Sequence, residues 1–108
     1  MVNKLSVLRK TPQYSLVEFK AFVTSGKVFV QKRAEHKAMD LGYLLIDVHT
    51  CVLTLTDVHF DHAHLCPPDA YEGDVYHINY CLNDVTDPLY IKIKLETHRA
   101  VVMSFGRR

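Results

Sequence analysis

The first third of the chain has the hydrophobic spacing of amphipathic helices. Apolar residues recur every three or four positions over 16–23, and the preceding Ser15 forms with Glu18 the Ser-x-x-Glu pattern of a helix N-terminus. Gly26 ends this predicted helix. A second, more polar helix with a thin alanine-rich face is predicted over 31–41, and a glycine follows it directly.

The segment 46–60 fits two structures. Its valines and leucines have a spacing that suits a helix capped by Asp47, whereas its β-branched content favours a strand. We expect a helix. The residues from 61 to 73 are then expected to lead into a loop, which Pro67, Pro68 and Gly73 mark.

The last third alternates with the period of β-strands. Leu89–Glu96 places apolar and polar side chains on opposite faces, which predicts one buried and one solvated face. Strands are also predicted over 74–81 and 100–105, and the short connections between these segments imply antiparallel order. A short edge strand is expected at 27–30, after an extended polar lead-in over 1–13.

These elements predict an α+β fold in which N-terminal helices pack on a C-terminal antiparallel sheet. The chain has 108 residues, of which 48% are hydrophobic and 23% charged, so we expect a single domain over 1–108. No apolar run approaches the ~20 residues of a membrane helix, and the N-terminus lacks a secretion-signal pattern. Three cysteines without Cys-x-x-Cys spacing exclude a disulfide framework and favour a reducing cytoplasm.

Charge is segregated along the chain, although the net charge is only +1. Residues 1–40 carry eight Lys/Arg and three acids, 41–88 carry eight acids and no Lys/Arg, and 89–108 carry five Lys/Arg and one acid. Folding can join the two basic ends into a surface for a phosphate-bearing partner, although small domains also cluster charges by chance. Five of the seven histidines lie in the acidic middle.

The densest group of chemically useful side chains is His59, Asp61, His62 and His64. In a strand, His62 and His64 share a face about 7 Å apart, and His77 is expected on a neighbouring strand. One interpretation is general acid–base cleavage of RNA without a metal. A second is a Zn²⁺ site, and a third is a set of exposed loop histidines without a role.

Basic and aromatic side chains form two further candidate sites. Tyr90, Lys92 and Lys94 share the solvated strand face, where they can stack on a base and meet phosphates, or serve only as a wet surface. Arg107 ends the last strand and can stabilise a phosphorane-like transition state. With Arg108 it also fits a solubilising basic tail.

Several short motifs occur in a recognisable order. They are Arg9-Lys10-Thr11-Pro12, Ser25-Gly26-Lys27-Val28, Leu41-Gly42, Leu55-Thr56, Phe60-Asp61-His62, Asp74-Val75-Tyr76-His77, Leu89-Tyr90-Ile91-Lys92 and Met103-Ser104-Phe105. Their order and spacing resemble the MqsR family, the motility quorum-sensing regulator toxins of bacterial toxin–antitoxin pairs. The resemblance runs from about residue 9 to the C-terminus.

The resemblance implies a RelE-type ribonuclease fold and an mRNA endoribonuclease that needs no metal or other cofactor. It also implies a cognate antitoxin, expected to combine a zinc-binding Cys-x-x-Cys domain with a helix-turn-helix domain. Tyr90 and Lys92 match the family's Leu-Tyr-x-Lys motif. Three positions depart from the family: His62 and Gly106 stand where it has lysines, and Gly73 stands where it has a glutamine.

We therefore expect a cytoplasmic toxin that cuts mRNA and stops translation and growth. The expected catalytic residues are His62, Tyr90, Arg107, His64 and His77. The expected RNA-binding residues are Lys92, Lys94 and Arg108. The alternative is a catalytically degenerate toxin-fold module that binds a partner protein or RNA without cutting it, which the missing family lysines favour.

Overall fold

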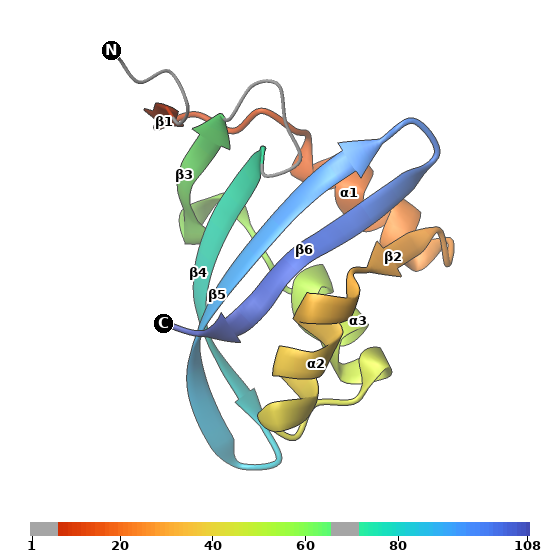
Figure 1. Ribbon diagram of the computed structural model, residues 1–108, viewed down its shortest axis with the longest axis vertical. Coiled ribbons are helices and arrows are strands. Elements are labelled where there is room, and N and C mark those ends of the chain that lie inside the picture. The colour runs from red at the N-terminus through yellow and green to blue at the C-terminus, as the bar shows by residue number, and fades with distance from the viewer. Residues whose placement is uncertain (1–6, 66–71) are drawn as a thin grey trace.

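A mixed six-stranded sheet with three helices on one face makes up the described part of the chain, residues 7–65 and 72–108 of a computed structural model (Figure 1). The strands lie in the order β1-β3-β4-β5-β6-β2. In chain order the elements are β1 (Val7–Arg9), α1 (Leu16–Thr24), β2 (Val28–Val30), α2 (Lys32–Asp40), α3 (Leu45–Leu53), the 3₁₀ turn η1 (Asp57–His59), β3 (Phe60–Leu65), β4 (Gly73–Leu82), β5 (Val85–Glu96) and β6 (Arg99–Arg107).

The predicted limits of the first two helices are confirmed. Ser15 caps α1, since its Oγ accepts a hydrogen bond from the Glu18 backbone N–H at 3.1 Å. Gly26 and Gly42 follow α1 and α2 with φ of 78° and 92°, a left-handed conformation that favours glycine and ends a helix. No helix within the described ranges is long and apolar enough to span a membrane.

The predicted helix over 46–60 is correct only in its first half. α3 ends at Leu53, and Asp47 lies inside its first turn, where a carboxylate oxygen accepts the Leu44 backbone N–H at 2.8 Å. After the helix, the Thr56 backbone N–H donates to His59 Nδ1 at 2.9 Å. Such local side-chain bonds compete with helix continuation, so the chain turns through η1 into β3.

The sheet is mixed, so the expectation of an antiparallel sheet is wrong at one edge. β2 runs parallel to β6, with Val28 opposite Ala100. The helices are also interleaved with strands rather than forming an N-terminal block, since β1 and β2 precede α1 and α2. These pairings join segments far apart in the chain, which local alternation does not report.

The expected lead-in contains a strand, β1, that the sequence pattern missed, whereas His62 and His64 lie on a strand as considered from the sequence. β3 extends through Leu65 and pairs antiparallel with β1, which lies within the expected lead-in. The Pro67-Pro68 part of the predicted loop lies outside the described residues. The predicted polar connection over 82–88 is only a two-residue turn, because Asn83 and Asp84 adopt φ of 53° and 67°.

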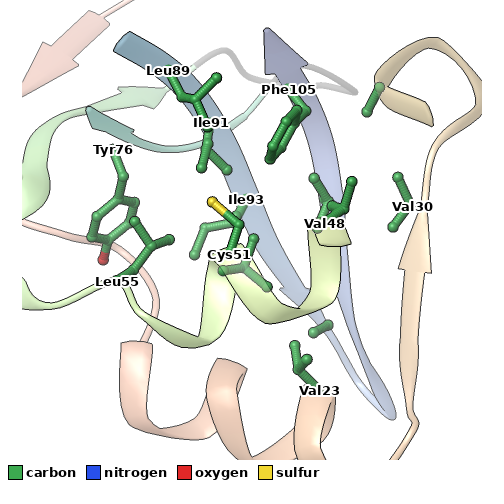
Figure 2. Close-up of a cluster of buried hydrophobic side chains, with 14 of the residues drawn as sticks. Val23, Val30, Val48, Cys51, Leu55, Tyr76, Leu89, Ile91, Ile93 and Phe105 are labelled. Carbon is green, nitrogen blue, oxygen red and sulfur yellow. The ribbon is translucent and has the colours of Figure 1, made fainter. Parts of the chain in front are cut away.

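The hydrophobic core lies between the helices and one face of the sheet, the helix face (Figure 2). Alternate residues Leu89, Ile91 and Ile93 of β5 enter this core as the sequence predicts. Cys51 of α3 is fully buried among them, and burial raises the pKa of its thiol to about 12. Cys51 is therefore a core side chain and is not a nucleophile at neutral pH.

Asp74 fixes the start of α1 to β4. It is 0% exposed, and its carboxylate accepts the backbone N–H of Gln13 at 3.0 Å and that of Tyr14 at 2.9 Å. Burial raises the pKa of Asp74, and these backbone N–H groups act in the opposite direction. The Asp-Val-Tyr motif has a structural basis here, because Val75 and Tyr76 are also buried.

Candidate active site on the sheet face opposite the helices

A β-bulge in β3 turns Asp61 and His62 toward the same side of the sheet. Phe60 pairs with Tyr76 and its ring contacts that residue on the helix face, whereas His62 pairs with Val75. Asp61 is thus the extra residue of the bulge. Because a bulge re-aims the side chains beside it, Asp61 and His62 both reach the opposite side, the far face.

Asp61 joins two imidazoles from neighbouring strands. Its Oδ2 lies 2.7 Å from His62 Nδ1, and its Oδ1 lies 3.4 Å from His77 Nδ1. The hydrogen bond from His62 is the main cause that holds the pKa of Asp61 below its ordinary value, and His77 adds to it. Since an ionised carboxylate only accepts, Nδ1 of His62 carries the hydrogen, and in the neutral ring Nε2 is then the nitrogen that can accept a proton.

Tyr90 extends this group onto β5. It pairs with His77, and the two ring centroids lie 5.8 Å apart. Burial is the main cause that raises the pKa of Tyr90, and the negative charge of Asp61 raises it further. The phenol therefore keeps its proton at neutral pH and can act as a donor.

Lys92 is not on a solvated surface, so that part of the prediction is wrong. Lys92 is only 5% exposed, and its Nζ lies 3.1 Å from His64 Nδ1. The rings of His64 and His62 are 6.5 Å apart, so these two histidines share a face as predicted. The lysine stem is buried because Gly73 of the adjacent strand leaves room beside it: a Cβ at Gly73 would lie 3.1 Å from Lys92 Cε.

Replacing Gly73 with alanine is expected to lower the free energy of unfolding by about 1–3 kcal/mol, since overpacking forces neighbours to shift. The added Cβ would lie 2.9 Å from the Ile93 carbonyl oxygen and 2.9 Å from Met103 Sδ. Urea denaturation measures the change. Gly106→Ala is the matched control, because its Cβ meets nothing closer than Lys37 Cδ at 3.7 Å. Equal midpoints for the two variants would contradict the expectation.

Two of the other predicted basic residues are held by acids away from the histidines. Lys94 Nζ lies 3.6 Å from Glu96 near the far end of β5. Arg107 donates to the nearly buried carboxylate of Asp87 at 3.1 Å, and the Tyr43 hydroxyl donates to the other oxygen at 3.2 Å. Arg107 therefore links the end of β6 to Asp87 and is not directed at His62.

Arg108 is closer to the histidine group. Its Nη2 donates to Asn79 Oδ1 at 2.6 Å. Asn79 lies two residues after His77 on β4 and pairs with Pro88, which lies two residues before Tyr90 on β5. The alternation of these strands thus puts Arg108 at the same far face.

His59 does not join the other histidines, because its Nδ1 accepts the Thr56 backbone N–H at 2.9 Å in η1. The four-residue metal site considered from the sequence is therefore not assembled. Within residues 7–65 and 72–108, no group of three or more His, Cys, Asp or Glu side chains is arranged to hold a metal ion.

A cavity of about 250 Å³ opens beside Tyr90, between α2 and the end of β6. β2 pairs with only Ala100–Val102 of β6, and α2 also contacts this strand. The basic residues that line the cavity are Arg33 and Lys37 of α2, with Arg107 and Arg108 of the C-terminus. The two basic ends of the chain thus meet at this place.

Arg33 and Lys37 are cavity residues that are absent from the candidates predicted from the sequence. Their spacing of four residues puts them on one face of a helix, and this signal was available from the sequence. It does not tell which element the helix face meets. Only the fold shows that the partner is the C-terminal strand.

Comparison with protein families gives the class of this chain. Residues 11–107 match the family described as motility quorum-sensing regulator, toxin of MqsA. The chain is therefore the toxin of a toxin–antitoxin system, with an antitoxin as its partner. Because the match covers nearly its whole length, it belongs to the MqsR toxin family, as the motifs predict. A search of curated proteins finds no match.

Proposed function

We propose that this toxin is a metal-independent mRNA endoribonuclease that acts in the cytoplasm and stops translation and growth. The observation that carries the proposal is the Asp61–His62 pair, 2.7 Å between Oδ2 and Nδ1, beside the protonated phenol of Tyr90. A base held by a carboxylate and a separate proton donor are the two groups that cleavage at a ribose 2′-hydroxyl needs.

In the proposed reaction, His62 Nε2 takes the proton of a ribose 2′-hydroxyl. The 2′-oxygen attacks the adjacent phosphorus, and the bond from phosphorus to the 5′-oxygen breaks. Tyr90 gives its proton to the leaving 5′-oxygen, and His77, in contact with both Asp61 and Tyr90, is the alternative donor. The products are a 2′,3′-cyclic phosphate and a 5′-hydroxyl, and the proton on His62 returns to Tyr90 through water.

The negative charge that develops on the phosphorane needs nearby cations. Lys92 supplies one of these positive charges next to His64. Because the lysine is nearly buried, water screens its electric field less than that of a surface lysine. Arg107 lines the cavity next to Tyr90 and is paired with Asp87, so in this proposal it contributes to binding of the RNA strand rather than to the charge of the phosphorane. Lys94 lies with Glu96 at the outer end of β5 and contributes to long-range attraction of RNA.

His62 stands where the family has a lysine. The hydrogen bond between His62 and the Asp61 carboxylate lets the imidazole take the role of a base at this position. An imidazole changes protonation near neutral pH and so serves as a base under cellular conditions better than an ammonium does. The RelE-type arrangement, and an antitoxin with a zinc-binding domain and a helix-turn-helix domain, belong to the same proposal and rest on the family match.

The test is induction of the chain in growing bacteria without its antitoxin. Growth is expected to stop, and mRNA is expected to be cut into fragments with 5′-hydroxyl ends. A chain that carries both His62→Ala and Tyr90→Phe is the inactive control. Unimpaired growth with intact mRNA would instead favour the alternative, a toxin fold that binds a partner without cutting RNA.

A further inference from the structure

We infer that the cavity between α2 and the end of β6 binds a phosphate of the RNA strand beside the one that is cut, and that Lys37 is its main ligand. This inference rests on the proposed function and extends it to a second site on the substrate. Nothing in the family match or in the proposed reaction requires Arg33 or Lys37.

The charge of the cavity favours an anion. Four cations line it, and none of the described residues that line it is acidic. Asp87 pairs with Arg107 at 3.1 Å and offsets part of its charge, and Asn79 accepts a hydrogen bond from Arg108 at 2.6 Å, so both guanidinium groups are oriented at the border of the cavity. Cations fixed in advance bind a phosphate at a lower entropic cost than mobile surface lysines do.

The lack of a side chain at Gly106 leaves room for the side chain of Lys37. A Cβ at Gly106 would lie 3.7 Å from Lys37 Cδ, so the lysine stem passes beside the space that a side chain at 106 would enter. Gly106 is also where the sequence departs from the lysine of the family. In this chain the Lys37 stem from α2 thus passes the strand position where the family has a lysine.

The position of the cavity favours a nucleotide strand over a free anion. Tyr90 lines it, and the ring of Tyr90 also contacts His77 of the histidine group. A strand that crosses Tyr90 can therefore put one phosphate in the cavity and another at His62. The volume of about 250 Å³ is below the usual range for a whole ligand, which suits a phosphate with part of its sugar.

Binding of a labelled RNA in which every 2′-hydroxyl is methylated tests the inference, because such RNA cannot be cut by the proposed reaction. Fluorescence anisotropy over a range of salt concentrations gives Kd and its salt dependence. Lys37→Gln is expected to raise Kd about 3- to 10-fold and to reduce the slope of log K against log salt by about 0.7, the value for one phosphate contact on a single strand. Lys32→Gln, on another face of α2, is the matched control.

A rescue variant separates phosphate binding from a structural role. Lys37→Ala combined with Gly106→Lys is expected to recover most of the lost affinity, because the strand then supplies the ammonium. Equal Kd values for Lys37→Gln and Lys32→Gln, or no recovery in the double variant, would overturn the inference. Inorganic phosphate that competes as well as a dinucleotide would also overturn it by indicating a free-anion site. Failure of the wild type to cut ordinary RNA, with these binding differences intact, would overturn only the proposed function.

Discussion

Replacement of His62 by alanine is expected to lower the rate of RNA cleavage by about 10²- to 10⁴-fold, the usual contribution of a general base. Its Nδ1 donates a hydrogen bond to Asp61 at 2.7 Å, and its side chain is partly exposed, so its removal is expected to leave the fold intact. Single-turnover cleavage of a labelled RNA, with enzyme in excess, measures the chemical step directly.

His98→Ala is the matched control, because His98 is exposed in the turn between β5 and β6. It is expected to cleave RNA at the wild-type rate. Asp61→Asn is expected to lose less than His62→Ala, since Asp61 only positions the imidazole and fixes which nitrogen carries hydrogen. A His62→Ala protein that melts at the wild-type temperature and cleaves within a few-fold of the wild-type rate would exclude His62 as the base.

Replacement of Asp74 by alanine is expected to lower the free energy of unfolding by about 2–4 kcal/mol, because it leaves partly buried backbone donors without their acceptor. The backbone N–H groups of Gln13 and Tyr14 both donate to this fully buried carboxylate. Loss of these hydrogen bonds releases the start of α1 from β4. Urea denaturation at neutral pH measures the change in the midpoint.

Asp40→Ala is the control for Asp74→Ala. Asp40 is exposed at the last position of α2, where an acid gains nothing from the helix dipole. Its removal is expected to change stability by less than about 0.5 kcal/mol. If Asp74→Ala is as stable as Asp40→Ala, the carboxylate does not fix α1 to the sheet.

The parts of the fold that depend on neighbouring residues are predictable from the sequence. Ser15, Gly26 and Gly42 set the ends of α1 and α2 through contacts and dihedral angles within a few residues. The alternation of Leu89 and Ile91 likewise follows from the geometry of one strand. The parallel pairing of β2 with β6 is not local, and no pattern within either segment reports it.

The candidate site was predictable in its residue types more than in its geometry. The sequence indicates His62 and Tyr90, but it does not reveal the bulge that turns Asp61 toward His62. The burial of Lys92 depends on the absence of a side chain at Gly73 on the next strand. The alternation along β5 alone predicts that such a lysine is exposed to solvent, because the pattern contains no information about the neighbouring strand.

The chemistry of the RNA ends tests the central claim most directly. Protein purified without an affinity tag is incubated with an RNA oligonucleotide in EDTA, and the products are identified by mass spectrometry. The proposed reaction predicts fragments with a 2′,3′-cyclic phosphate on one side of the cut and a 5′-hydroxyl on the other. Intact RNA, or fragments that end in a 5′-phosphate and a 3′-hydroxyl, would contradict it.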